Sequence, residues 1–160
     1  MLRGGSFTGR GGAEAYGIYN ADSDTTLEAE GVSALGENGS VFNNDGLYNG
    51  TGAEATLRGG SFTGRGGAEA YGIYNGPSGA TLEAESVSAL GENGSVNYGL
   101  YNYDATADVT QSVLEGATNS VSRASGTVTI SNGRLVSVTY GTVTCVAVSQ
   151  GTAFYASVCP

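Results

Sequence analysis

The side chains that point most directly to chemistry in this sequence are tyrosines that recur in one short segment. Gly-Ile/Leu-Tyr-Asn occurs four times, ending at residues 20, 49, 75 and 102. Successive side chains of a strand point to opposite faces, so a Tyr that follows a buried Ile or Leu points outward. One aromatic strip is therefore expected from Tyr19, Tyr48, Tyr74 and Tyr101. Such a strip could stack on sugar rings, pack against another subunit, or stabilise its own strands by ring stacking.

An asparagine follows each of these tyrosines, which gives a second recurring column: Asn20, Asn49, Asn75 and Asn102. Stacked amides can hydrogen-bond along the stack and also satisfy backbone groups of a turn. We therefore expect a scaffold ladder at one corner of a repeating structure.

Charged residues alternate in sign from one repeat to the next. The residue after the leading leucine of each repeat is in turn Arg3, Glu28, Arg58 and Glu83. If these positions stack, neighbouring rungs carry opposite charges about 5 Å apart. A second set of contacts is expected between Arg10 and Glu37 and between Arg65 and Glu92. Exposed ion pairs contribute only about 0–1 kcal/mol each, so we interpret both sets as scaffold that fixes the register.

Residue types that catalyse reactions or bind metals are sparse. The chain has no His, and Asp22 with Asp24 is the one acidic pair that could suggest a metal. No catalytic residue, metal site or cofactor is therefore expected. The net charge of −9, with arginine as the sole basic residue type, disfavours nucleic acid and anionic membranes as partners. No apolar run approaches the ~20 residues that span a bilayer, so membrane insertion is not expected.

Two cysteines, Cys145 and Cys159, lie close to the C-terminus. A disulfide between them would tie down the last strand and contribute roughly 3 kcal/mol. It would also imply an oxidising compartment and hence a secreted or surface-displayed protein. Two free buried thiols are the alternative.

An internal repeat governs the whole chain. Leu2–Asn20 returns unchanged at Leu57–Asn75, and Leu27–Val41 returns at Leu82–Val96 with one difference. The period is therefore 55 residues, and each period is itself double, because Leu2, Leu27, Leu57 and Leu82 begin similar patterns. Because Met1 is followed at once by the middle of a repeat, we expect the sequence to be a fragment of a longer array.

The spacing within each half-repeat predicts strands. Apolar and small residues alternate by two, then slip by one residue, which requires two short strands joined at a corner. The Tyr-containing segment supplies a third strand. We predict an all-β, right-handed parallel β-helix of about six coils, each with 21–30 residues and three short strands. Residues 1–108 are expected to form four near-identical coils, and 109–160 divergent coils and a terminating segment of the same domain.

The G-[IL]-Y-N and L-x-[GA]-x-x-[FV] patterns, from about Leu2 to Gly116, resemble those of bacterial and phage right-handed β-helix repeat proteins. That family includes tail-spike and adhesin-like stalks, many of them trimeric, and polysaccharide-cleaving enzymes such as pectate lyases. The resemblance implies a secreted, cell-surface or virion-surface protein that forms homo-oligomers, with a trimer favoured. We expect a non-catalytic structural stalk module. The alternatives are a carbohydrate-binding adhesin that uses the Tyr strip and a polysaccharide depolymerase of the tail-spike type.

Overall fold

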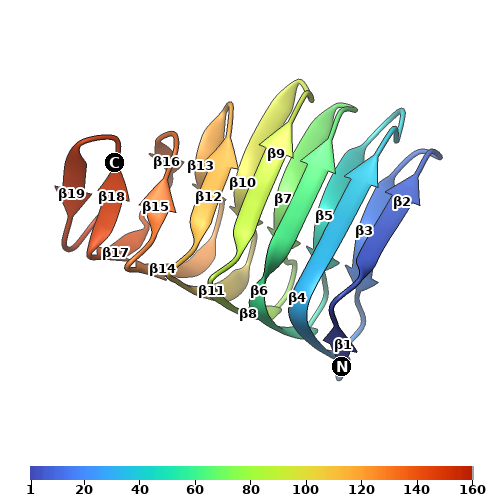
Figure 1. Ribbon diagram of the computed structural model, residues 1–160, viewed down its shortest axis with the longest axis horizontal. Coiled ribbons are helices and arrows are strands. Elements are labelled where there is room, and N and C mark those ends of the chain that lie inside the picture. The colour runs from blue at the N-terminus through green and yellow to red at the C-terminus, as the bar shows by residue number, and fades with distance from the viewer. Residues whose placement is uncertain (160) are drawn as a thin grey trace.

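The computed structural model describes residues 1–159, which form a stack of β-strands without any helix (Figure 1). No helix able to cross a membrane is therefore present in this part of the chain. The N- and C-termini lie at opposite ends of the stack. Pairing between coils is parallel throughout, and the last two strands alone pair antiparallel as a hairpin. The protein is thus a parallel β-solenoid, as the repeat predicts.

The larger of the two sheets supplies most of the wall of the solenoid. It has 13 strands: β1 (Leu2–Arg3), β2 (Ser6–Arg10), β4 (Thr26–Glu37), β6 (Glu54–Arg65), β8 (Thr81–Glu85), β9 (Ser88–Glu92), β11 (Ala105–Thr110), β12 (Val113–Gly116), β14 (Gly126–Ser131), β15 (Arg134–Leu135), β17 (Thr144–Val146), β18 (Val148–Gln150) and β19 (Ala153–Tyr155).

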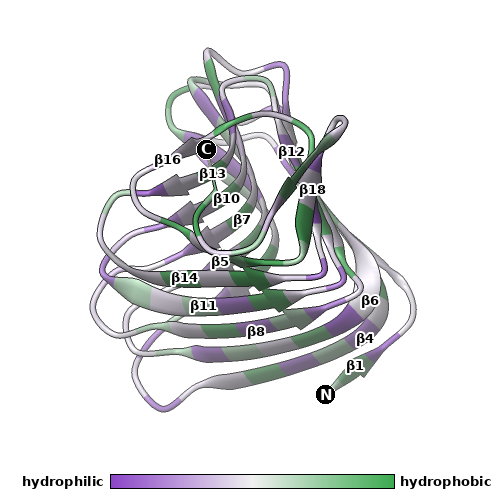
Figure 2. Cartoon of the chain, turned by 90° about the vertical axis from the view of Figure 1, so that its left-hand side faces the viewer, coloured by the Kyte–Doolittle hydropathy of each residue, from purple (hydrophilic) through white to green (hydrophobic). Residues whose placement is uncertain are grey.

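The smaller sheet contains the Tyr segments. It has six strands: β3 (Ala15–Asn20), β5 (Asn43–Asn49), β7 (Glu69–Asn75), β10 (Val96–Asn102), β13 (Asn119–Arg123) and β16 (Thr139–Tyr140). Seen along the stack, the larger sheet bends into two walls, one with β8, β11 and β14 and one with β12 and β18, while the smaller sheet closes the third side (Figure 2).

The bend in the larger sheet lies where the phase slip predicts a corner. One residue at the bend of each coil has a positive φ of 52–65°: Gly4, Gly31, Gly59, Ser86, Gln111, Asn132 and Ala147. This left-handed conformation reverses the inward and outward order of side chains, and glycine adopts it at the least cost. The strands β4 and β6 run through the bend, whereas the other coils split into two strands there.

Large and small side chains alternate along the core. Leu2 pairs with Ala29, Ala29 with Leu57, and Leu57 with Ala84. Two residues earlier in each coil, the opposite alternation runs through Leu27, Ala55, Leu82 and Ala107. Each coil thus contributes one leucine and one alanine at similar total volume, which fills the interior evenly. The expected alignment of all four leading leucines in one column is wrong by two residues, because it would stack leucine on leucine.

The coils become shorter toward the C-terminus. The steps between stacked core positions are 27, 28, 27, 25, 21 and 15 residues, read along Leu2, Ala29, Leu57, Ala84, Val109, Ile130 and Cys145. The solenoid has about four turns, fewer than the six coils expected, because the last coils are truncated. Residue 108 lies within β11, and both sheets continue across this position.

The C-terminal end of the stack is covered by its own chain. The strand β19 pairs antiparallel with β18, and Val158 bridges to Thr144 in the same sense. The predicted disulfide is present between Cys145, which is fully buried, and Cys159. The edge of the sheet is thus shielded from further strand pairing at this end.

Candidate functional site

The asparagine column forms the ladder that the sequence predicts. Nδ2 of Asn20 donates to Oδ1 of Asn49 at 2.7 Å, and the same bond joins Asn49 to Asn75 and Asn75 to Asn102 at 2.8 Å. Each amide donates its other hydrogen to a backbone carbonyl of the following coil, at 2.9–3.0 Å. Asn49, Asn75 and Asn102 are fully buried with their polar groups bonded, so the asparagine ladder is scaffold.

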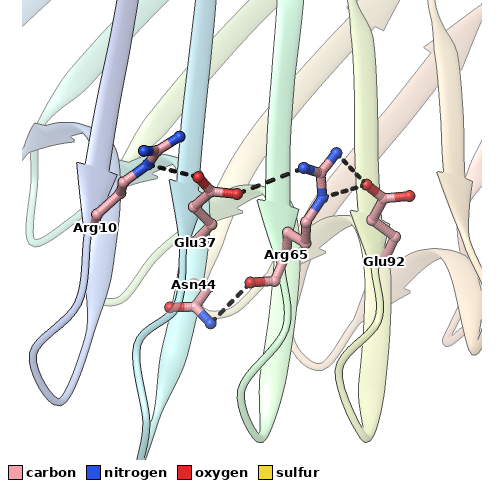
Figure 3. A network of polar contacts seen from close by, with 5 residues as sticks. All are labelled: Arg10, Glu37, Asn44, Arg65 and Glu92. Carbon is pink, nitrogen blue, oxygen red and sulfur yellow. Dashed lines mark hydrogen bonds and ion pairs between the residues drawn. The ribbon is translucent and has the colours of Figure 1, made fainter.

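An arginine–glutamate ladder joins the first four coils on the larger sheet (Figure 3). Arg10 Nε contacts Glu37 at 2.6 Å, Arg65 Nη1 contacts the second oxygen of Glu37 at 3.5 Å, and Arg65 Nη2 contacts Glu92 at 2.6 Å. The two expected pairs are confirmed, and the contact between Arg65 and Glu37 links them. The Glu37 side chain is 10% exposed, so this ladder is partly removed from water.

The other expected charge ladder, Arg3–Glu28–Arg58–Glu83, is wrong. Arg3 lies opposite Glu30, with Nε 3.6 Å from the Glu30 carboxylate. Arg58 pairs in register with Glu30 and Glu85, while Glu28 and Glu83 both lie opposite Thr56. The two-residue shift that alternates leucine with alanine moves each glutamate by the same distance. Opposite charges still alternate, along Arg3, Glu30, Arg58 and Glu85.

The predicted Tyr strip is continuous on the outer side of the smaller sheet. The Tyr19 and Tyr48 rings are 5.0 Å apart and inclined by 6°, and those of Tyr48 and Tyr74 are 4.8 Å apart and inclined by 13°. Tyr101 follows, with its ring 5.4 Å from Tyr74 at 41°. Tyr19 at the N-terminal end is 61% exposed, so the strip presents aromatic surface to solvent.

A second aromatic column, which counting by two from the buried Ile or Leu does not predict, lies beside this strip. Tyr16 contacts Tyr19 and Tyr48 at 5.1 and 5.3 Å, and Tyr71 contacts Tyr98 and Tyr101 at 5.4 and 5.2 Å. We name the two columns together the tyrosine face: Tyr16, Tyr19, Tyr48, Tyr71, Tyr74, Tyr98, Tyr101 and the acid Asp45, which stacks between Tyr16 and Tyr71.

Glycine explains why both columns lie on one face. A Cβ added to Gly17 would lie 2.5 Å from the backbone N of Leu35, and one added to Gly72 would lie 2.4 Å from the backbone N of Leu90. The smaller sheet therefore packs backbone to backbone against the larger one at these glycines. Because the glycine and the following Ile or Leu both face inward, the tyrosines on either side of this pair both face outward. The signal in the sequence was the recurring Tyr-Gly-Ile/Leu-Tyr.

Asp45 interrupts the second column with a carboxyl group. Its side chain is fully buried, and neither oxygen has a hydrogen-bond partner. Two further acids flank it on the neighbouring strands. Tyr16 donates its hydroxyl hydrogen to Glu14 at 2.5 Å, and Tyr71 donates to Glu69.

Burial sets the protonation of the tyrosine face. Burial raises the pKa of Asp45 well above its usual value, and the charges of Glu14 and Glu69 raise it further. Burial also raises the pKa of the Tyr71 and Tyr16 phenols, and their hydrogen bonds to Glu69 and Glu14 add to the effect. The phenols therefore remain protonated donors at neutral pH, and Asp45 favours its neutral form.

The outer face of the larger sheet has a shallow hollow of about 360 Å³, lined in part by Thr56, Arg58, Glu83 and Asp108. Glu83 and Asp108 lie opposite each other on neighbouring strands, an arrangement of like charges that destabilises a sheet. Within residues 1–159, no group of three or more His, Cys, Asp or Glu side chains is arranged to hold a metal ion.

The fold defines the class of the protein as a parallel β-solenoid with one disulfide. Comparison of the chain with protein-family models, with curated proteins and with solved structures returns no match. Function therefore has to be argued from the ladders and the tyrosine face themselves.

Proposed function

We propose that this chain is a non-catalytic structural module that acts as a rigid extracellular stalk and associates with copies of itself. The observation that carries the proposal is the unbroken asparagine ladder, whose buried amides tie each of the first four coils to the next. Together with parallel pairing in both sheets, it resists bending between coils. The disulfide is compatible with an oxidising, extracellular compartment.

The self-association part of the proposal predicts the mass of the protein in solution. The chain has a mass of 16.0 kDa, and a tail-spike-like stalk is expected at three times this value. Size-exclusion chromatography with light scattering on the whole chain measures it directly. A monomer at all accessible concentrations would contradict self-association. Release of reducing ends or unsaturated products from acidic polysaccharides would contradict the non-catalytic part and favour the depolymerase alternative.

The tyrosine face favours a second candidate function, carbohydrate binding by a surface adhesin. Stacked rings with hydroxyl groups at their edges offer both apolar surface and hydrogen bonds to sugars. Replacing both Tyr48 and Tyr74 by Ser is expected to abolish binding in a glycan screen if this function holds. Tyr140→Ser is the matched control, because Tyr140 is 64% exposed and is separated from Tyr101 by the rung of Ser122. Equal loss in both variants would contradict a specific site.

A further inference from the structure

We propose that the tyrosine face binds an organic cation, a guanidinium or alkylammonium group, over Asp45. The cation would lie against the rings of Tyr16, Tyr48, Tyr71 and Tyr74, between the carboxylates of Glu14 and Glu69. This inference concerns a binding site and does not depend on the structural role proposed above.

The unpartnered carboxyl of Asp45 is the first observation behind the site. Asp45 is fully buried, both its oxygens lack hydrogen-bond partners, and it occupies the position that Tyr16 and Tyr71 hold on the adjacent strands. A buried polar group without a partner costs roughly 1–3 kcal/mol and is rare in native proteins. A fourth tyrosine would complete the column, so the acid has no scaffold role that the neighbouring residues reveal.

The aromatic rings around Asp45 are the second observation. The charge of Asp45 acts on the phenols of Tyr16, Tyr48, Tyr71 and Tyr74, which come from three neighbouring strands. The faces of aromatic rings attract cations, and cages of several rings recognise alkylammonium and guanidinium groups in particular. The rings thus provide a surface that is complementary to an organic cation in charge as well as in shape.

The charges at the rim are the third observation. The phenols of Tyr16 and Tyr71 donate to Glu14 and Glu69, and the charged groups that act on Asp45 are these two glutamates. The nearest arginine ladder holds its guanidinium groups elsewhere, since Arg10 and Arg65 contact Glu37 and Glu92. Three acids therefore converge on one aromatic surface without a basic group from the described residues among the charges that act on Asp45.

The same charges decide between a cation and other occupants. A neutral sugar could donate a hydrogen bond to Asp45 but would leave three converging acids uncompensated. A second copy of the chain would bring another net charge of −9 to the same surface. A cation compensates the acids and stacks on the rings, so it satisfies both features at once.

Binding can be followed through tyrosine fluorescence, because the chain contains ten Tyr and no Trp. The probe is N-acetylarginine amide, and the matched control is N-acetylcitrulline amide, which has the same shape without the charge. An octaarginine peptide distinguishes a free small cation from the side chains of a basic partner. We expect the arginine probe to bind at least about tenfold more tightly than the citrulline probe. Tighter binding of the peptide than of the monomer would assign the site to a basic segment.

Asp45→Asn keeps the size of the side chain and removes its charge, and is expected to weaken binding of the arginine probe by at least about tenfold. Glu28→Gln removes a charge from the larger sheet and is expected to change binding less than about twofold, as for a distant screened charge. If Asp45→Asn does not fold, the double variant Glu14→Gln/Glu69→Gln tests the rim without altering the buried position. Equal binding of the two probes, or unchanged binding in both the Asp45 and the rim variants, would overturn the proposal.

The pH dependence provides an independent readout. A bound cation favours ionised Asp45, so affinity is expected to rise with pH across the raised pKa of Asp45. The titratable groups that face Asp45 are Glu14 and Tyr16 near β3, Tyr48 on β5, and Glu69, Tyr71 and Tyr74 on β7. Asp45→Asn should flatten this rise. A rise that persists unchanged in the variant would refute a role for Asp45.

Discussion

The asparagine ladder and the tyrosine face are built on the same strands, and Tyr48 and Asn49 are neighbours in the chain, yet the two regions differ in how completely their polar atoms are bonded. Asn49, Asn75 and Asn102 bond both amide hydrogens and pass the pattern on to the next coil. On the tyrosine face, Asp45 is equally buried and bonds nothing.

This difference separates scaffold from candidate site. A repeated scaffold position improves with each identical neighbour, because every added rung satisfies the one before it. Asp45 breaks its column, and the break costs free energy that the repeat itself would avoid with a tyrosine. We therefore interpret regular columns as stabilising and the one irregular buried acid as the place where a partner is expected.

Removing a central rung of the asparagine ladder is expected to have the largest effect. Asn75→Ala leaves Nδ2 of Asn49, Oδ1 of Asn102 and the carbonyl of Thr106 without their bonds. Because these groups are buried, the free energy of unfolding should fall by about 3 kcal/mol. Asn20→Ala at the partly exposed end of the ladder should cost about 1 kcal/mol. Urea unfolding of both variants measures the difference, and equal losses would show that the ladder does not act through burial.

Replacing Asp45 is expected to have the opposite sign. The folded state holds the Asp45 proton more tightly than the unfolded chain, so Asp45 lowers stability increasingly as pH rises above its ordinary pKa of about 4. Asp45→Tyr, which reproduces the residue of the neighbouring coils, should raise the free energy of unfolding at pH 7 by about 1–2 kcal/mol.

The pH dependence isolates the acid from the other carboxyl groups. Asp45→Asn compared with the unaltered chain should show a stability difference that is smallest near pH 3 and grows toward neutral pH. Denaturant unfolding between pH 3 and 8 provides this comparison, with Glu28→Gln as a control on the larger sheet. A difference that is constant over this range would mean that Asp45 is not held neutral by the fold.

The arginine–glutamate ladder should lie between these extremes. Arg65→Gln leaves Glu92 without its ion pair and Glu37 with Arg10 alone, and the Glu37 side chain is only 10% exposed. We expect a loss of about 1–2 kcal/mol, reduced by high salt. Arg3→Gln removes a pair whose side chains are 70% and 65% exposed, and should cost at most about 0.5 kcal/mol. Similar losses for the two variants would place the Arg65 contacts among ordinary surface pairs.

The repeat alone predicted the features that depend on fixed spacing. The strand positions, the bend, the asparagine ladder and the strip of Tyr19, Tyr48, Tyr74 and Tyr101 all follow from which residues recur. Register was harder, because the closest sequence match aligns leucine with leucine, whereas packing at constant volume alternates Leu57 with Ala29 and Ala84. A sequence comparison rewards identity between repeats, but a packed core rewards complementarity.

The second tyrosine column escaped for a different reason. Counting by two from Ile18 places Tyr16 inside, and only the close approach of the two backbones at Gly17 turns Tyr16 outward. The burial of Asp45 depends on rings from several strands, which no local pattern reveals. What the sequence does contain is the substitution itself, since Asp45 replaces a tyrosine in an otherwise regular column.

The smallest effect expected concerns the bend, where the column of left-handed residues changes from glycine to other types. Gly31 and its counterpart Ser86 have φ values of 61° and 57°, and a serine is less favourable than a glycine in this conformation. Ser86→Gly should therefore raise the free energy of unfolding by about 0.5 kcal/mol, since relief of strain exceeds the added entropy of the unfolded chain. Ser88→Gly in β9 is the matched control two residues away, and should lower stability by about 0.5–1 kcal/mol, because Ser88 lies within a strand. A thermal and urea comparison of the two variants tests the argument, and loss of stability in both would mean that the bend, like the asparagine ladder, is already satisfied by the residue it has.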